Sequence, residues 1–389
     1  MWLETLFLLF LWKSDTMIKR IIEDKILADF RRKKVIVLLG ARQVGKTTLL
    51  SAIEGGFRKI LSLNCDNVDD VLELEGKTST ELNHLLSPYD LVLIDEAQRV
   101  RNIGLVLKII GDLKLDTQVI VTGSSSLDMA NEINELATGR LLEHNLYPFS
   151  LSELADATSE REERRLLENR MIYGLYPEVV NEPADAKRTL MSLTNNYLYK
   201  DLFTYKGIKK PDLIQKLVRA LALQLGSEVS YNELSNLLGV DRSTVESYIN
   251  LLEKCFVVFR LDSFSRNIRN EIKKGKKVYF YDNGIRNAVI SNFAPLELRT
   301  DVGVLWENLM VSERVKRNAY TSSFANLYFW RTHEQQEIDL IEEEDGILRA
   351  YEFKWNTKAK VKMPKSFAEN YQNSIYEVIT PDHFWSFLR

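Results

Sequence analysis

The chain has 389 residues, enough for two or three domains, and its 45% hydrophobic and 28% charged residues are typical of a soluble globular protein. Its formal net charge of -3 excludes a strongly basic protein, so any surface for nucleic acid has to be a local patch. The only cysteines, Cys65 and Cys255, exclude a disulfide framework and a cysteine-rich zinc site, and they favour a reducing cytoplasm.

A short apolar run, residues 6–12, precedes the first expected helix. The run is shorter than the roughly 20 residues that a helix needs to cross a bilayer. It also lacks the basic start and the small-residue cleavage site of a signal peptide. Because an amphipathic helix is expected over residues 18–30, Met17 is the start that the pattern favours. We therefore expect residues 1–16 to be a tail outside the fold, with a membrane or partner anchor as the alternative.

The strongest motif, residues 40–47, fits G-x-x-x-x-G-K-S/T without a mismatch and lies between an apolar strand pattern and a helix pattern. The two glycines let backbone N–H groups face phosphate oxygens, and the new helix adds its positive N-terminal end. Lys46 is expected to meet the β- and γ-phosphates and Thr47 to ligate magnesium. A chance glycine turn is the alternative. The predicted cofactors are ATP and Mg²⁺, and the predicted contacts are Gly40, Ala41, Arg42, Gln43, Val44, Gly45, Lys46, Thr47 and Thr48.

A second motif supports hydrolysis as well as binding. Residues 91–94 are apolar and lead into Asp95 and Glu96, which predicts a core strand with two carboxylates at its carboxyl end. Open parallel sheets bind ligands at that edge. We expect Asp95 to hold the magnesium ion through water and Glu96 to orient and deprotonate the attacking water.

Two further residues are candidates for sensing the γ-phosphate. The strand expected over residues 119–122 ends beside Ser124, with Thr122 behind it, although the serine-rich turn also suits a helix cap. Arg140 follows a glycine turn and is a candidate arginine finger, acting in its own subunit or in a neighbour. A surface salt bridge is the alternative role for Arg140.

Together these segments resemble a large prokaryotic family of AAA+-type ATPases with a C-terminal restriction-endonuclease-like domain of unknown function. The resemblance continues in residues 147–150, 173–179, 197–201, 280–286 and 330–332, and it covers essentially everything from Met17 onward. One departure is Leu175, where the family often repeats glycine. The resemblance implies an ATPase and supplies no cellular role.

Residues 151–212 are expected to form a helical lid beside the nucleotide, with the charge run 160–165 as a solvated face. Residues 213–285 predict a winged helix: two helices joined at Gly239, then two wing strands. This is the expected DNA-binding surface. Glu246 on the second helix instead favours a protein-binding scaffold. The predicted DNA contacts are Arg242, Ser243, Thr244, Tyr248, Lys273, Lys274, Lys276 and Lys277.

The last segment, residues 286–389, predicts a small α/β domain that resembles restriction-endonuclease-like nucleases. Glu307 lies on a helix, Asp339 on a strand, and Glu352 and Lys354 on the next strand after a hairpin at 345–346. Strand alternation sends Glu352 and Lys354 to one face, where Asp339 and Glu352 are candidates to share a metal ion. A surface hairpin with a salt bridge is the alternative.

The predicted fold is thus α/β: a parallel-sheet P-loop NTPase core of AAA+ type (residues 17–150), a helical lid, a winged helix and a nuclease-like domain. The expected function is a Mg²⁺-dependent ATPase coupled to DNA binding. The alternatives are an ATP-gated DNA nuclease and a signalling ATPase whose C-terminal domains bind protein. We expect a cytoplasmic protein, with a homo-oligomer as a candidate assembly.

Overall fold

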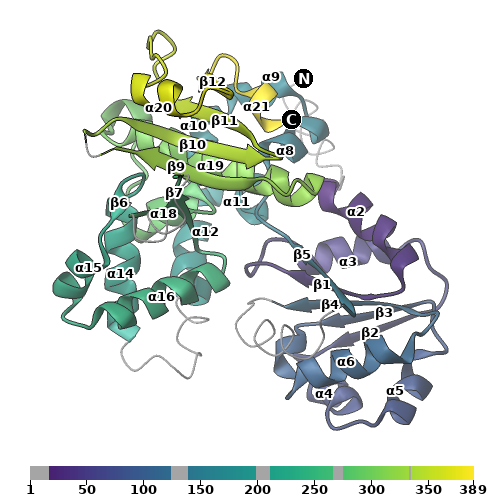
Figure 1. Ribbon diagram of the computed structural model, residues 1–389. Helices are drawn as coiled ribbons and strands as arrows, with labels where there is room; N and C mark the ends of the chain where they lie inside the picture. Colours follow the sequence, from purple (N-terminus) through teal and green to yellow (C-terminus); the bar gives the residue numbers. More distant parts are fainter. Residues whose placement is uncertain (1–16, 124–138, 199–210, 266–274, 333) are drawn as a thin grey trace, which may run out of the picture.

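The computed structural model describes residues 17–123, 139–198, 211–265, 275–332 and 334–389 (Figure 1). The tail 1–16 and the candidates Ser124, Lys273 and Lys274 lie outside the described residues. Within the described part, no helix is both long enough and apolar enough to span a membrane.

Within the described residues, five parallel strands form the first sheet, in the order β2-β3-β4-β1-β5. The apolar runs explain its centre, because β1, β4 and most of β3 are buried along their length. Parallel strands require crossover connections, and the described crossovers are helical, so the strands' carboxyl ends meet at one edge. The expected P-loop α/β class is therefore confirmed. The elements are β1 (Val35–Leu39), β2 (Ile60–Asn64), β3 (Leu91–Asp95), β4 (Gln118–Gly123), β5 (Leu141–Asn145), α3 (Lys46–Glu54), α4 (Val68–Leu74), α5 (Ser79–Leu86) and α6 (Ile103–Leu113).

Short helices follow this sheet, in the segment expected to form the helical lid. The first helices divide at Leu166, and α12 continues into a π-helical turn, Leu193–Leu198. The expectation of a solvated face at 160–165 is wrong for Glu163, which is buried against Arg170 at 2.9 Å. The helices are α8 (Leu151–Ala157), α9 (Glu160–Arg165), α10 (Leu167–Tyr173), α11 (Pro177–Asn181) and α12 (Ala186–Ser192).

The next part contains two helices joined by a turn, as the sequence predicts. Gly239 adopts a φ of 63° between α15 and α16, a conformation that glycine takes at little cost. Asp241 precedes α16, but its side chain makes no capping hydrogen bond. The elements here are α14 (Pro211–Leu223), β6 (Glu228–Val229), α15 (Tyr231–Leu238), α16 (Arg242–Lys254), β7 (Val258–Ser263) and β8 (Lys276–Phe280).

The two strands interpreted as a wing are part of a larger sheet. Seven of the described strands form it, in the order β12-β11-β10-β9-β7-β8-β6, and β7 pairs in parallel with β9. This sheet therefore crosses the boundary expected between residues 285 and 286. Figure 1 shows it on the opposite side of the molecule from the first sheet. The remaining elements are α2 (Ile21–Asp29), α18 (Asn283–Val289), α19 (Val302–Thr321), β9 (Asn326–Arg331), β10 (Glu337–Glu344), β11 (Ile347–Phe353), α20 (Lys365–Asn370), β12 (Ser374–Ile379) and α21 (Trp385–Leu388).

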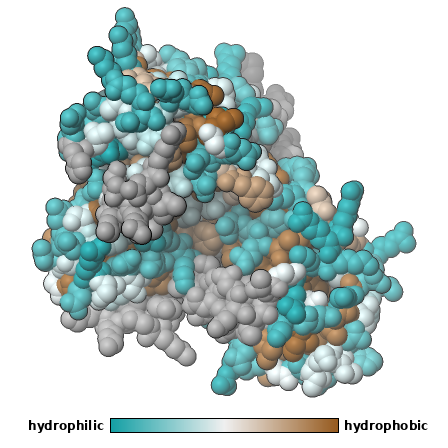
Figure 2. Space-filling model, in the orientation of Figure 1, coloured by the Kyte–Doolittle hydropathy of each residue, from teal (hydrophilic) through white to brown (hydrophobic). Residues whose placement is uncertain are grey.

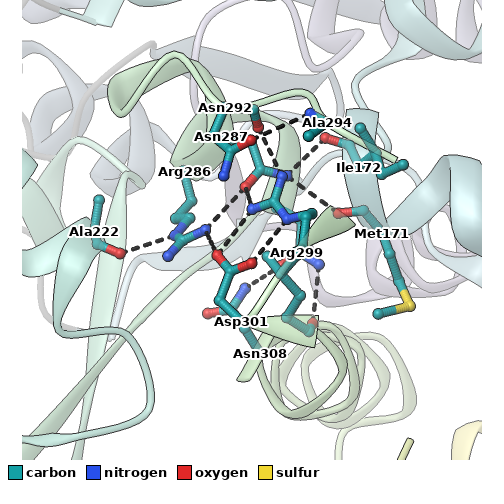
Figure 3. Close-up of polar contacts among 12 residues, drawn as sticks. Met171, Ile172, Ala222, Arg286, Asn287, Asn292, Ala294, Arg299, Asp301 and Asn308 are labelled. Carbon is teal, nitrogen blue, oxygen red and sulfur yellow. Dashed lines mark hydrogen bonds and ion pairs between the residues drawn. The ribbon is translucent and has the colours of Figure 1, made fainter. Parts of the chain in front are cut away.

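A buried polar network fixes the start of α19 (Figure 3). Arg286 on α18 and Arg299 both pair with Asp301, the residue that precedes α19. Asn287 accepts a hydrogen bond from Arg299 at 2.9 Å and donates one to the carbonyl of Ile172 on α10 at 2.8 Å. The network thus ties α10, α18 and the N-terminus of α19 into one rigid joint.

The face of the first-sheet part shown in Figure 2 carries apolar side chains over the region of α4 and α6. Val68 and Leu72 on α4 are 69% and 59% exposed, and Leu105 on α6 is 46% exposed. Single exposed apolar side chains of this kind are ordinary on a protein surface, so these three residues do not by themselves indicate a binding site.

Candidate active site

The phosphate loop has the backbone geometry that its glycines predict. Gly45 adopts a φ of 95° immediately before α3, and Gln43 also has a positive φ of 62°. Gly40 is required for a different reason: a Cβ built there would lie 2.3 Å from the carbonyl oxygen of Leu146, which follows β5. The first glycine therefore lets the loop pack against the neighbouring strand, and the second lets it turn into the helix.

Lys46 and Thr47 occupy the first turn of α3, where the sequence placed them. Lys46 is 5% exposed, and its Nζ donates to the carbonyls of Gly40 and Ala41 at 3.0 Å each. The Thr47 hydroxyl donates to Asp95 Oδ2 at 2.9 Å. A hydroxyl and a carboxylate side by side are oxygen donors of the kind that Mg²⁺ prefers, so these residues fit the expected ion.

Thr122 joins the site from the neighbouring strand β4. Its side chain is fully buried, and its hydroxyl donates to Asp95 Oδ1. The same hydroxyl accepts the backbone N–H of Glu96 at 3.2 Å. Glu96 takes a left-handed conformation with φ of 54°, and the Gln98 amide donates to its carboxylate. Thr122 therefore fixes the relative position of the two acidic residues.

A cavity of about 590 Å³ lies over the loop and Glu96. Its opposite wall comes from α11 and the residue that follows it, through Pro177, Glu178, Asn181 and Glu182. The sequence did not predict these residues as part of the site, although Pro177 and Glu178 lie in the 173–179 motif and proline favours the first turn of a helix. A smaller cavity of about 140 Å³ adjoins the first and shares Gly45, Thr48, Pro177 and Asn181 with it.

Arg140 does not lie at this cavity, so its role as an arginine finger in its own subunit is wrong. Its carbonyl accepts from the N–H of Val35 at the start of β1, whereas the phosphate loop follows the end of β1. The five residues of β1 span roughly 16 Å, so Arg140 and the phosphate loop lie at opposite ends of this strand. The side chain pairs with Asp112 on α6, which matches the salt-bridge alternative. Action on a neighbouring subunit stays a prediction.

The four nuclease-like candidates do converge on one face of the second sheet. Leu340 pairs with Tyr351 in antiparallel register, which sets Asp339 directly opposite Glu352. The turn at 345–346 has positive φ at both residues, as a two-residue hairpin requires. Asp339 accepts the N–H of Phe353 at 2.8 Å. Lys354 donates to Glu352 at 2.6 Å.

Lys277 lies in the same cluster, which the sequence did not predict. Its Nζ pairs with Glu307 at 3.2 Å and with Glu337, and the side chain is 1% exposed. The hydroxyl of Tyr279 donates to Glu307 at 2.6 Å. We call Lys277, Glu307, Glu337, Asp339, Glu352 and Lys354 the acid cluster.

Burial dominates the acid–base behaviour of the acid cluster. It raises the pKa of Glu307 to about 7, with Asp339 as the second cause. Burial also raises the pKa of Asp339 and of Glu352, for which the charge of Asp339 is the second cause. Burial opposes charge on Lys277 too, but Glu307, then Asp339 and Glu337, raise its pKa overall. The lysine therefore stays charged and balances carboxylates that are difficult to ionise together.

The acid cluster does not fit a metal centre built from three carboxylates. Among the described residues, no group of three or more His, Cys, Asp or Glu side chains is arranged to hold a metal ion. The ammonium groups of Lys277 and Lys354 already contact Glu307, Glu337 and Glu352. Only Glu352 Oε2 is a buried carboxylate oxygen without a hydrogen-bond partner in the described part of the chain.

Some of the predicted DNA contacts are exposed in the structure, and others are buried. Tyr248 is 8% exposed and Lys277 is 1% exposed, so neither reaches a phosphate backbone, and both predictions are wrong. Both residues were predicted to face DNA from their positions in the sequence. In the structure Tyr248 lies on the buried face of α16, and Lys277 lies in the acid cluster. Arg242 and Ser243 are exposed at the start of α16, and Thr244 is half-buried. Arg242 and Lys276 line a cavity of about 670 Å³ that also contains Glu228, Glu233 and Glu246.

Comparison with known proteins assigns the first part of the chain to a class. Residues 32–155 match a sequence family described as an AAA domain. Residues 164–296 and 302–381 match two families, each described as a domain of unknown function (DUF8612 and DUF4143). With the phosphate loop and the order of the parallel sheet, the match shows that residues 32–155 form a P-loop domain similar to AAA ATPase domains.

The relatives extend over most of the chain. An uncharacterised protein of Mycobacterium tuberculosis is 28% identical over 330 residues, which cover 83% of this chain and 70% of the relative. An uncharacterised protein of Haemophilus influenzae is 25% identical over 277 residues, covering 65% of this chain and 68% of the relative. The structure of the Walker-type ATPase of Pyrococcus abyssi is similar in fold, with a TM-score of 0.50 and 16% identity, covering 71% of this chain and 97% of that one.

Proposed function

We propose that this chain is a Mg²⁺-dependent ATP hydrolase in which Glu96 is the general base. The observation that supports it most is the contact of Thr47 with Asp95 beside Glu96, at the carboxyl edge of the sheet and next to the phosphate loop. The larger cavity takes the triphosphate, since the loop, Lys46 and Glu96 line it. The smaller cavity takes the adenine base of ATP. Its lining is largely apolar, through Ile18, Val44, Leu49 and Phe149.

The reaction follows from these positions. Bound Mg²⁺, held by Thr47 and through water by Asp95, would supply charge stabilisation for the β- and γ-phosphate oxygens. Lys46 adds positive charge at the same oxygens. Glu96 accepts a proton from water as the water oxygen bonds to the γ-phosphorus and the bond to the β–γ bridging oxygen breaks. Thr122 and Gln98 hold Glu96 in place.

Release of phosphate from ATP by the purified chain tests this function directly. Turnover is expected with Mg²⁺ and is expected to disappear when EDTA removes the ion. Phosphate release that is indifferent to EDTA would contradict the metal role of Thr47 and Asp95.

A coupled DNA contact is supported by the start of α16. Arg242 and Ser243 are exposed there, at the positive end of a 13-residue helix that can receive a phosphate. The three glutamates of the neighbouring cavity oppose a broad phosphate surface and favour the protein-binding alternative.

We expect Arg242→Ala together with Lys276→Ala to weaken duplex binding and to lower its salt dependence by about 0.9 in log–log slope for each lost phosphate contact. A gel shift or fluorescence anisotropy series over salt concentration measures both effects. Arg188→Ala is the matched control, because Arg188 is an exposed arginine on α12 and does not line the cavity beside α16. If the unmodified chain binds no duplex, or if the slope is unchanged, the site is not at α16.

Metal-dependent DNA cleavage is the alternative role of the acid cluster, supported by the unpartnered Glu352 oxygen. We expect supercoiled DNA to stay intact with Mn²⁺, with and without ATP, because the two lysines already pair with three of the four carboxylates. Nicking that Asp339→Asn abolishes would instead establish an ATP-gated nuclease.

A further inference from the structure

Arg20 is buried between the phosphate loop and the C-terminal part of the chain. The side chain is 5% exposed, and each of its three guanidinium nitrogens donates a hydrogen bond. Nε donates to Glu153 on α8 at 2.9 Å, Nη1 to the carbonyl of Val44 at 2.8 Å, and Nη2 to the carbonyl of Tyr147 at 2.7 Å. Nη2 also reaches the hydroxyl of Tyr320 at 3.3 Å.

The contact with Val44 fixes one peptide plane of the phosphate loop. A trans peptide points its C=O and its N–H in opposite directions. Since the Val44 carbonyl points at Arg20, the N–H of Gly45 points away from it. Gly45 also lines the larger cavity and has the positive φ that turns the loop into α3. Loss of the Arg20 contact frees this peptide to rotate, and the phosphates then meet a less ordered loop.

Tyr320, near the C-terminus of α19, holds Arg20 from the other side. Its hydroxyl accepts from Arg20 and from the N–H of Tyr147 at 3.2 Å, and the residue is 4% exposed. Burial raises the pKa of Tyr320, with Glu153 as the second cause, so the hydroxyl stays neutral. The three nitrogens of the Arg20 guanidinium thus donate in fixed directions to separate acceptors. The single ammonium group of a lysine cannot reproduce this arrangement.

The same helix holds the backbone that follows β5. Lys316 donates to the carbonyl of Phe149 at 3.0 Å, and Glu313 accepts the N–H of Leu151 at 2.7 Å. The 147–150 motif is therefore a docking segment for α19. The other end of α19 follows Asp301, which lies in the buried network of Figure 3, and carries Glu307 of the acid cluster.

We propose that Arg20 is a positioning residue for the triphosphate and that Tyr320 acts through it, so that α19 sets the conformation of the phosphate loop. This inference rests on the proposed binding of ATP at that loop. The helix α19 has 20 residues and is about 30 Å long, and the 13 residues from Glu307 in the acid cluster to Tyr320 beside the loop cover about 20 Å of it as one continuous element.

Calorimetric titration of the full chain with Mg²⁺–ATP tests the proposal. Tyr320→Phe removes one hydroxyl and keeps the ring, and we expect the ATP dissociation constant to rise about 3- to 10-fold. Tyr351→Phe is the matched control. It also removes a buried hydroxyl that accepts from an arginine of α19, Arg314, but Tyr351 lies on β11 of the second sheet. Its ATP affinity is expected to stay within about twofold of the unmodified chain.

Two further readouts separate positioning from a loss of folded protein. In steady state, Tyr320→Phe should raise KM for ATP and leave kcat within about twofold, whereas partial unfolding lowers the apparent kcat. Arg20→Lys should weaken binding at least as much, and adding Tyr320→Phe to it should cost little more, because the two residues act as a unit.

Unchanged ATP affinity in Tyr320→Phe, or fully additive losses in the double variant, would overturn the proposal. Failure of the unmodified chain to bind ATP would overturn the proposed function, and this inference with it.

Discussion

Lys46→Ala is expected to abolish nucleotide binding, and Glu96→Gln is expected to keep binding and lose turnover. Lys46 lies inside the loop, 3.0 Å from two of its carbonyls, so its charge is in place to meet the β- and γ-phosphates. Glu96 lines the same cavity but is held by Thr122 and Gln98, at the position of a base. A general base contributes about 100- to 10,000-fold, and turnover should fall by that order.

Titration with Mg²⁺–ATP and a phosphate-release assay on each variant measure the two effects separately. Glu73→Gln on α4 is the control for an acid-to-amide change, since Glu73 is exposed away from the cavity. Turnover by Glu96→Gln at the unmodified rate would show that Glu96 is not the base.

Replacement of Lys277 is expected to destabilise the C-terminal sheet strongly, and replacement of its neighbour Lys276 is not. Lys277→Ala leaves Glu307 and Glu337 without their buried cation, a loss of about 3–5 kcal/mol in the free energy of unfolding. Lys276 pairs with Asp262 at 3.2 Å near the surface, and Lys276→Ala should cost less than about 1 kcal/mol.

Urea denaturation followed by circular dichroism measures both changes. Adding Glu307→Gln to Lys277→Ala should restore part of the loss, because one of the uncompensated carboxylates is then neutral. Equal losses for the two lysines would contradict the assignment of Lys277 to the acid cluster.

The ATPase site was predictable because its chemistry is local in sequence. Gly40, Gly45, Lys46 and Thr47 lie within one turn between a strand and a helix, and Asp95 ends an apolar strand. Parallel strands then bring these ends together without further information. The hairpin that sets Asp339 opposite Glu352 was predictable for the same reason.

The misplaced residues depend on contacts between distant segments. Lys277 stands in a basic run, and only the pairing of β7 with β9 carries its strand to Glu307 and Glu337. The wall formed by α11 requires residues 177–182 to return to the phosphate loop, which periodicity does not reveal. Arg140 follows a glycine turn, which suited an arginine finger. The register of β5 against β1 instead places it at the amino edge of the sheet, away from the phosphate loop.

The nucleotide recovered from Glu96→Gln after incubation with Mg²⁺–ATP is the most direct test of ATP binding and of catalysis by Glu96. Protein separated from free nucleotide and then denatured releases what it held, and chromatography identifies it. Intact ATP is expected from Glu96→Gln and ADP from the unmodified chain. ADP from both would contradict the catalytic role of Glu96, and no nucleotide from either would contradict ATP binding itself.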